Sequence, residues 1–264
     1  MRPDKPDYKN WVPLGLIGSL YGGVIASIVV FAILTNALSG TAKTVVGVII
    51  GIVFIVMVVA SVSMTKLYMA FSYDGEKKFS ARIIDQVSDY VKLPEGGVGL
   101  DVGCGSGALT NACAKKNPEA KMVGLDKWGP EYASFNLKLC EKNAMAEWVE
   151  NQVSFVDGDA VKLDYPDETF DAVTSNYCYH NIPSKDRQAI ILESLRVLKK
   201  GGTFAIHDEF TKSKYGDTDQ LVQKIKDLGF EKVELLDTSD GLFMSRKEAK
   251  KLFLVGSGLL VGKK

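Results

Sequence analysis

The chain has 264 residues, of which 32 are basic and 32 acidic, so its formal net charge is zero. Residues 1–66 carry five basic and two acidic side chains, and the remainder carries 27 and 30, which argues against a nucleic-acid-binding protein. Four cysteines show no CxxC or zinc-ligand spacing, which indicates reduced thiols and excludes a disulfide scaffold.

Two long apolar segments open the chain. Residues 11–42 contain no charged side chain, and after Lys43 none follows until Lys66. About 20 apolar residues in a helix are enough to cross a bilayer. We therefore predict an N-terminal transmembrane hairpin over residues 1–66, with spans near 13–34 and 44–64. A secretory signal peptide is the alternative for the first segment, but its apolar core is too long and a second segment follows.

The loop predicted between the spans is too short to hold a domain, so both ends of the chain are expected on one side of the cell membrane. The loop contains one basic residue, Lys43. Six basic residues lie on the other side of the two spans: Arg2, Lys5, Lys9, Lys66, Lys77 and Lys78. By the positive-inside rule, both termini and the domain that follows are predicted to be cytoplasmic.

Both spans contain small residues spaced four apart, Gly18, Gly22 and Ala26 in the first and Gly47 and Gly51 in the second. Such faces allow close helix approach in lipid, so we expect them to pack the hairpin, with homodimerisation as a second interpretation. Neither span contains an ionisable residue, which argues against a transporter or channel. The lipid bilayer is thus the first predicted partner, and the hairpin is interpreted as an anchor.

Residues 67–78 form a polar predicted linker. From Phe79 to Val91, apolar side chains recur at helical spacing, which predicts an amphipathic helix at the start of a domain covering residues 79–264.

Residues 98–110, VGLDVGCGSGALT, combine an apolar strand, a glycine loop and the start of a helix. Glycine accepts backbone angles closed to other residues and leaves no side chain between a ligand and the main chain. The start of a helix adds unpaired N–H groups. The segment therefore predicts a site for a nucleotide-like cofactor.

Two cofactor classes fit this loop. Gly103, Gly105 and Ala108 satisfy the dinucleotide pattern GxGxxG/A, which would indicate an NAD(P)-dependent oxidoreductase. Asp101, however, would repel a pyrophosphate and attract a cationic amino group. An apolar strand with an acidic residue before GxGxG resembles motif I of the class I S-adenosylmethionine (SAM) dependent methyltransferases. We therefore predict SAM as cofactor, bound by Asp101, Gly103, Cys104, Gly105 and Gly107.

Beyond the loop, apolar strand-like runs alternate with helical stretches, which predicts an α/β Rossmann-like fold with helices on both faces of a mostly parallel sheet. Helices are predicted near 108–116, 131–146, 184–198 and 218–228, with a turn at 199–202. The apolar runs predict seven strands, near 98–102, 121–125, 152–156, 170–175, 203–207, 232–236 and 252–255. The resemblance implies that the last of them is antiparallel.

Further cofactor residues are expected at the ends of the second and third strands. Asp126 ends the second, where a carboxylate can reach ribose hydroxyls, and Lys127 follows it. Trp128 either flanks the adenine or caps the sheet edge. The resemblance implies that Asp159 and Ala160 hold the adenine.

The fourth strand leads into NYCYHNI, residues 176–182, at the edge where the transferable methyl group is expected. Asn176 and Tyr177 are predicted to line the methionine end of the cofactor, and Tyr179 and His180 to face the acceptor. An imidazole can take up a proton at neutral pH, so His180 is the candidate general base and Tyr179 a second catalytic candidate. Methyl transfer can also proceed by positioning alone, which leaves His180 a structural or substrate-positioning role.

Metal ligation is an alternative for His180, His207, Asp208 and Glu209, but their spacing is not diagnostic. We predict no metal and interpret these residues as the border of an acceptor pocket.

The sequence thus predicts a membrane-anchored methyltransferase of bacterial type, similar to the quinone-biosynthesis and small-molecule branch of the family. Its acceptor is expected to be small and lipophilic or membrane-associated, since an anchor confines the enzyme near such molecules. A noncatalytic membrane interaction protein that retains the SAM fold is, with the oxidoreductase, the remaining alternative.

Overall fold

The computed structural model describes residues 2–129 and 134–264. It separates into two compact units, one formed by Asn10–Ser80 and one by Ala81–Lys264 together with the N-terminal residues up to Lys9. The sequence prediction had grouped residues 2–9 with the hairpin. They pack instead on the larger unit, where the side chains of Tyr8 and Arg2 have hydrogen-bond partners.

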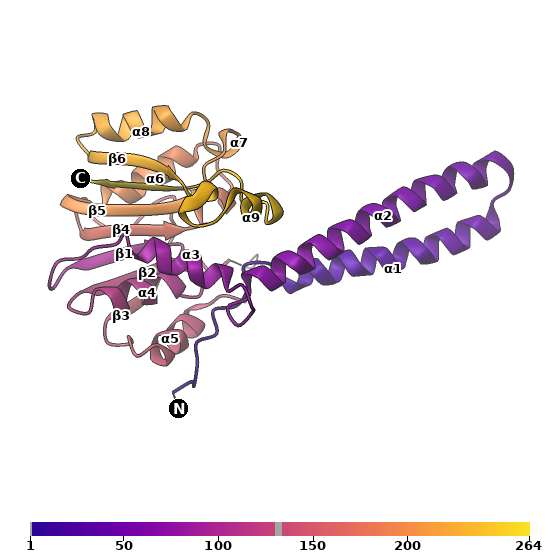
Figure 1. The fold of residues 1–264 in the computed structure, drawn as a ribbon. Coiled ribbons are helices and arrows are strands. Elements are labelled where there is room, and N and C mark those ends of the chain that lie inside the picture. The colour runs from indigo at the N-terminus through magenta and orange to yellow at the C-terminus, as the bar shows by residue number, and fades with distance from the viewer. Residues whose placement is uncertain (1, 130–133) are drawn as a thin grey trace. The chain divides into compact units, whose positions relative to one another are not determined.

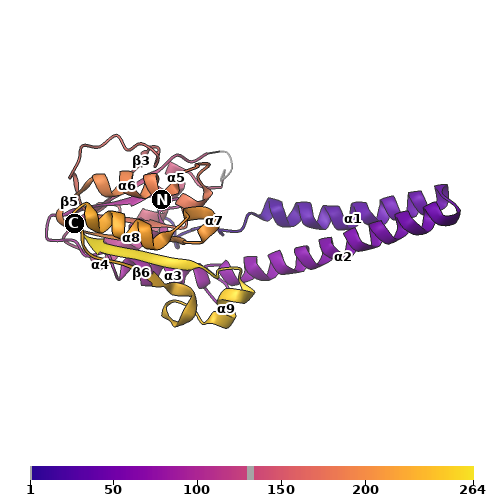
Figure 2. The same ribbon diagram turned by 90° about the horizontal axis from the view of Figure 1, so that it is seen from above.

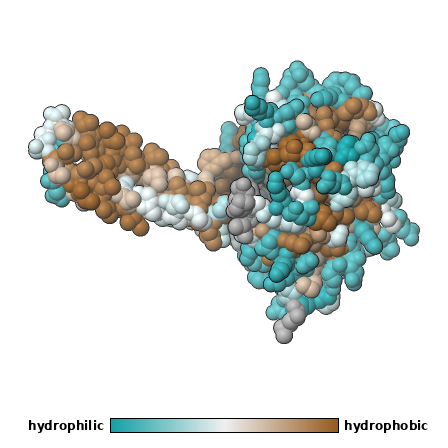
Figure 3. Space-filling view, turned by 180° about the vertical axis from the view of Figure 1, so that it is seen from behind, coloured by the Kyte–Doolittle hydropathy of each residue, from teal (hydrophilic) through white to brown (hydrophobic). Residues whose placement is uncertain are grey.

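The smaller unit contains helices α1 (Leu14–Ala37) and α2 (Gly40–Phe71), separated by Leu38 and Ser39. Both are long and apolar enough to cross a membrane. Their apolar side chains face outward, with Ile25 64% and Ile55 61% exposed, and Figure 3 shows a mostly hydrophobic surface on this hairpin. Because α2 continues to Phe71, it also includes the first five residues of the predicted linker.

The helices of the hairpin pack through different glycines from those expected. A Cβ atom at Gly18, Gly22 or Gly51 would meet nothing within 4 Å. A Cβ on Gly23 would instead lie 2.2 Å from Met57 Cε, and one on Gly47 would lie 3.6 Å from Phe31 Cε2. The prediction that both GxxxG faces pack the hairpin is therefore wrong for all but Gly47.

The larger unit is built on one sheet. Its strands are β1 (Val98–Val102), β2 (Lys121–Asp126), β3 (Val153–Asp157), β4 (Phe170–Asn176), β5 (Leu198–Glu209), β6 (Glu231–Asp237) and β7 (Ser257–Lys263). In the described part of the chain these seven strands have the order β3-β2-β1-β4-β5-β7-β6 (Figure 1). Neighbours from β3 to β5 are parallel, and β7 is antiparallel to both β5 and β6. The predicted seven-stranded, Rossmann-like sheet is confirmed.

Helices cover both faces of this sheet. They are α3 (Phe79–Ser88), α4 (Ala108–Lys116), α5 (Leu137–Ala146), α6 (Arg187–Arg196), α7 (Lys212–Tyr215), α8 (Thr218–Asp227) and α9 (Arg246–Lys251). Right-handed crossovers that run in opposite directions from β1 and β4 place α4 and α6 on opposite faces, as Figure 2 shows. The carboxyl ends of β1 and β4 are consequently the switch point at which ligands bind in open α/β sheets.

The largest differences between the predicted boundaries and the structure are at three places. The last strand is β7, and residues 252–255 precede it, because Phe253 has a left-handed φ of 57° that interrupts a strand. The predicted turn at 199–202 falls inside β5, where pairing with β4 shifts register. Helix α5 begins at Leu137 after the N-cap Asn136, and residues 131–133 of the predicted helix lie outside the described residues.

Candidate cofactor and acceptor site

The glycine loop between β1 and α4 depends on its glycines. Gly103, Gly105 and Gly107 have φ values of 75°, 57° and 80°, in the left-handed region that favours glycine. A Cβ on Gly103 would lie 2.1 Å from Cys178 Sγ, so there is no room for one. The loop is thus a stretch of bare backbone at the carboxyl end of β1.

Backbone and buried contacts hold this loop in place. The N–H groups of Gly103 and Cys104 both donate to Leu125 O, at 2.7 and 3.0 Å. Cys140 Sγ donates to Gly105 O at 3.2 Å. The Cys104 thiol is buried, and burial raises its pKa well above the usual value, so the thiol stays protonated. Cys104 therefore contributes backbone geometry to the site.

Asp101 lies inside the sheet next to the loop. Its side chain is 1% exposed and accepts a hydrogen bond from Thr110 Oγ1 at 2.6 Å. Burial raises the pKa of this carboxyl group from 3.8 to about 7, although the Thr110 hydrogen bond opposes the shift. A cationic ligand group close to Asp101 would favour its ionised form.

Asp126 is positioned at the end of β2 by the loop itself. Its Oδ2 atom accepts from the Gly105 N–H and its Oδ1 atom from the Trp128 N–H, each at 2.8 Å. Trp128 Nε1 donates to Gly105 O at 2.8 Å, so Trp128 braces the loop. Each carboxylate oxygen can accept a second hydrogen bond, and Asp126 retains the capacity to bind ribose hydroxyls.

Lys127 and Asp159, predicted separately, contact each other. Lys127 Nζ lies 3.0 Å from Asp159 Oδ2, and the Val161 N–H donates to Asp159 Oδ1 at 2.9 Å. The hydrogen bond from the Val161 N–H and, to a smaller extent, the contact with Lys127 hold the pKa of Asp159 below its usual value. The pair is largely exposed, so it costs little to open toward a ligand. Ala160 is buried beside it.

Asn176 and Tyr177 lie where β4 ends beside β5. Asn176 Oδ1 is 2.8 Å from His207 Nδ1, and the Tyr177 hydroxyl is 2.6 Å from Ser257 Oγ. Tyr177 has a left-handed φ of 49°, and its ring packs edge-on against the rings of His207 and His180. Burial lowers the pKa of His207 to about 3, which keeps this imidazole neutral.

His180 is paired with a buried carboxylate. Its Nδ1 atom and its backbone N–H both contact Asp208, whose side chain is 1% exposed. The Glu209 N–H adds a third hydrogen bond to Asp208, at 2.7 Å. A carboxylate on Nδ1 fixes the orientation of an imidazole and leaves Nε2 as the proton acceptor. Sequence reasoning placed Asp208 at the pocket border and missed this pairing, which joins residues 28 positions apart.

Tyr179 does not face the acceptor side. Its side chain is fully buried, and its hydroxyl lies 2.8 Å from Ser194 Oγ of α6. Residues 179–181 form a short 3-10 turn, which directs Tyr179 into the core and leaves His180 partly exposed. The predicted catalytic role for Tyr179 therefore does not fit the structure.

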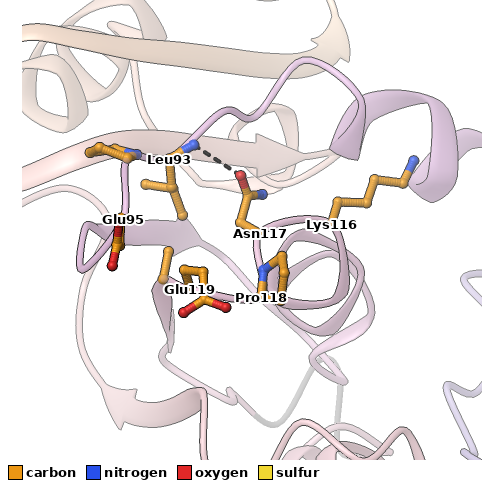
Figure 4. A pocket seen from close by; sticks show the side chains of 8 residues that line it. Leu93, Glu95, Lys116, Asn117, Pro118 and Glu119 are labelled. Atoms are coloured by element: carbon orange, nitrogen blue, oxygen red, sulfur yellow. Dashed lines mark hydrogen bonds between the residues drawn. The ribbon is translucent and has the colours of Figure 1, made fainter.

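A separate pocket lies near the amino ends of β1 and β2, at the opposite end of these strands from the glycine loop (Figure 4). It has a volume of about 240 Å³ and is lined by residues 93–95 and 116–120, which directly precede β1 and β2. The Leu93 N–H donates to Asn117 Oδ1 at 2.9 Å there. Since no predicted site residue lines this pocket, it is distinct from the carboxyl edge of the sheet.

Known proteins are similar to part of this chain. Residues 100–206 match the sequence profile of the methyltransferase domain family. Demethylmenaquinone methyltransferase of Lactobacillus johnsonii is 33% identical over 117 residues, which cover 44% of this chain and 45% of that protein. A sterol 24-C-methyltransferase of Gibberella zeae is 30% identical over 151 residues, 57% of this chain and 37% of that protein. The chain thus spans less than half the length of these relatives.

The cyclase SpnF has a similar solved structure, with a TM-score of 0.53 and 21% identity over 71% of this chain and 82% of that chain. At this identity the likeness shows a common fold, and fold alone does not define a reaction. The profile match shows that residues 100–206 are similar to methyltransferase domains, and the likeness to SpnF adds that the sheet and its helices have a fold found in solved structures.

Proposed function

We propose that this protein transfers the methyl group of SAM to a small lipophilic acceptor at the cell membrane. The proposal rests mainly on the glycine loop. Its three glycines have left-handed φ values, it lies beside the buried Asp101, and the Gly105 N–H donates a hydrogen bond to Asp126. Bare backbone next to carboxylates suits a ligand with a cationic amino group and a ribose. Asp101 also opposes a dinucleotide pyrophosphate, which disfavours the oxidoreductase.

The residues present fit the cofactor. Asp101 and the loop glycines would hold its methionine end, Asp126 its ribose, and Asp159 and Ala160 its adenine. When bound, SAM supplies an electrophilic methyl group on a sulfonium. Tyr177, whose ring contacts the rings of His180 and His207, is an aromatic side chain of the kind that stabilises a cation.

The acceptor side of the proposed site is built around His180. Asp208 orients the imidazole through Nδ1, so that Nε2 can accept the proton that a hydroxyl or amine loses as it is methylated. His207 is neutral and bonded to Asn176 and Thr238, so its part is to support the neighbouring side chains.

The lipophilic acceptor is supported by the apolar hairpin. A core helix of a soluble protein would be mostly buried, whereas 6% of each apolar window is buried here. We assign the hairpin as a two-span membrane anchor, with both termini and the domain on the cytoplasmic side. Relatives named for a demethylmenaquinone and a sterol act on acceptors of the same lipophilic character.

The segment between β6 and β7, residues 238–256, supports the same proposal. Thr238 Oγ1 lies 3.0 Å from His207 Nε2, and the Phe243 ring lies 5.2 Å from the His207 ring, so this segment borders the site. It exposes Phe253 (63%) and Val255 (41%) beside four exposed basic residues: Arg246, Lys247, Lys250 and Lys251. Basic and aromatic side chains in this combination suit an anionic lipid surface.

Methyl-labelled SAM tests the proposed function directly. The detergent-solubilised chain, incubated with labelled SAM and lipid extract of its native membrane, is expected to label a lipid-soluble product that mass spectrometry can identify. Asp101→Ala is the inactive control. Tight NAD binding without SAM binding would favour the oxidoreductase, and SAM binding without any labelled product would favour a noncatalytic interaction protein.

The double variant Lys250→Glu with Lys251→Glu tests the contribution of residues 238–256. In nanodiscs with anionic lipid, we expect the KM for the membrane acceptor to rise by at least about 30-fold, because each of the two lysines contributes on the order of 1 kcal/mol at such a surface. High salt should reduce the difference between wild type and variant. An unchanged KM in anionic nanodiscs would show that this segment does not contact lipid.

A further inference from the structure

The N-terminal strap, defined here as residues 2–9, belongs to the same compact unit as the methyltransferase domain. Tyr8 is its buried residue, with 7% of its side chain exposed. The Tyr8 hydroxyl donates to Glu147 Oε1 at 3.0 Å and accepts from Asn111 Nδ2 at 3.2 Å. Because Asn111 is on α4 and Glu147 follows α5, Tyr8 packs between these two helices.

Asn143 of α5 connects the strap to the glycine loop. Its Oδ1 atom accepts from the Asp7 N–H at 2.7 Å, and its Nδ2 atom donates to Asp7 O at 3.1 Å. The same Nδ2 donates to Ser106 O at 2.9 Å. Asn143 is 1% exposed, and its hydrogen bond to Ser106 is buried, whereas the two to Asp7 are partly buried.

Ser106 completes the connection from the loop side. Its Oγ atom donates to Tyr8 O at 2.9 Å, so both its hydroxyl and its carbonyl are bonded outside the loop. Ser106 lies between Gly105 and Gly107, whose backbones have more conformational freedom than any other residue type. Buried hydrogen bonds on both sides of Ser106 restrict that freedom.

We propose that the strap is a positioning element of the cofactor site and that Asn143 is its central positioning residue. Through Ser106, Asn143 and Tyr8 hold the glycine loop in the conformation that binds the cofactor. This inference rests on the proposed function, which assigns the loop to SAM. Since α1 begins at Leu14, five positions after Lys9, cofactor affinity then depends on residues that precede the first apolar helix.

Asn143→Ala tests the inference against a matched control, Asn117→Ala. Asn117 is also buried and makes three hydrogen bonds, to the Leu93 N–H, Val91 O and Cys113 O, but it lies beyond the far end of α4. Both variants lose a comparable set of buried contacts, so both should lower the melting temperature. Only Asn143→Ala should weaken binding of S-adenosylhomocysteine, by about tenfold in titration calorimetry of the full chain.

Amide hydrogen exchange provides a second readout. Exchange in residues 103–108 should accelerate in Asn143→Ala and stay at the wild-type rate in Asn117→Ala. Equal affinity losses in the two variants, or equal loop exchange, would overturn the inference. If Asn143→Ala does not fold, Ser106→Ala carries the same comparison, because it removes the hydroxyl bonded to Tyr8 O. A wild-type chain that fails to bind S-adenosylhomocysteine would contradict the proposed function itself.

Discussion

Asp101→Asn is expected to stabilise the ligand-free protein above pH 7 and, in the same variant, to weaken cofactor binding. Burial raises the pKa of Asp101 from 3.8 to about 7, and the nearby Asp126 charge adds to the effect. The ionised carboxylate is therefore unfavourable in the ligand-free fold, by on the order of 4 kcal/mol above pH 7. An asparagine is neutral at every pH and keeps an acceptor for the Thr110 hydroxyl.

The stability effect has a defined pH window. Between about pH 4 and 7 the folded protein retains a proton on Asp101 that the unfolded chain releases, so this residue makes stability fall as pH rises through the window. Thermal unfolding of wild type and Asp101→Asn should therefore nearly coincide below about pH 4, diverge as the pH rises, and reach the full difference by pH 8. A variant less stable than wild type at pH 8 would contradict the prediction.

Cofactor binding should favour the ionised form of Asp101, whereas the ligand-free fold favours the protonated form. If an ammonium group of the cofactor pairs with ionised Asp101, the wild-type affinity should fall about tenfold for each pH unit below 7. Asp101→Asn should bind more weakly at pH 8 and lose most of this pH dependence. Titration calorimetry with S-adenosylhomocysteine at pH 6, 7 and 8 measures both effects. The same pH dependence in variant and wild type would assign it to another group.

The glycine loop and the parallel strands were predictable because their causes are local. Gly103 is favoured by its own left-handed φ, and the buried strands appear in the sequence as apolar runs. Strand β7 was misplaced for a local reason as well. Its glycines weaken the strand signal, yet Gly262 is needed because a Cβ there would lie 2.6 Å from the Phe204 ring.

Contacts distant in sequence were not predictable. The strap reaches Asn143 across 136 positions, and nothing in the pattern of residues 2–9 indicates a docking partner. Tyr179 and His180 were assigned the same role because a short 3-10 turn has no periodicity that separates the inward from the outward side chain. The structure was needed to show that His180 is partly exposed and that its imidazole is paired with Asp208.

His180→Ala is expected to lower kcat by about 10²- to 10⁴-fold, the range associated with loss of a general base. Cofactor affinity should be nearly unchanged, because His180 lies on the acceptor side of the proposed site. The measurement is kcat and KM for the methyl acceptor, with cofactor affinity determined separately. A raised acceptor KM with unchanged kcat would instead assign His180 to substrate binding, the alternative role left open by the sequence.

Asp208→Asn should reproduce much of this loss, about 100-fold in kcat, because an amide group can donate to Nδ1 and so favour the tautomer whose Nε2 carries the proton. Residues that act as a unit are not additive, so His180→Ala combined with Asp208→Asn should be little worse than His180→Ala alone. Asp171→Asn is the matched control. Asp171 forms an ion pair with Lys199 and accepts a hydrogen bond from the Val98 N–H, but it lies at the amino end of β1, away from the proposed site. Additive losses in the double variant would show that Asp208 acts on catalysis independently of His180.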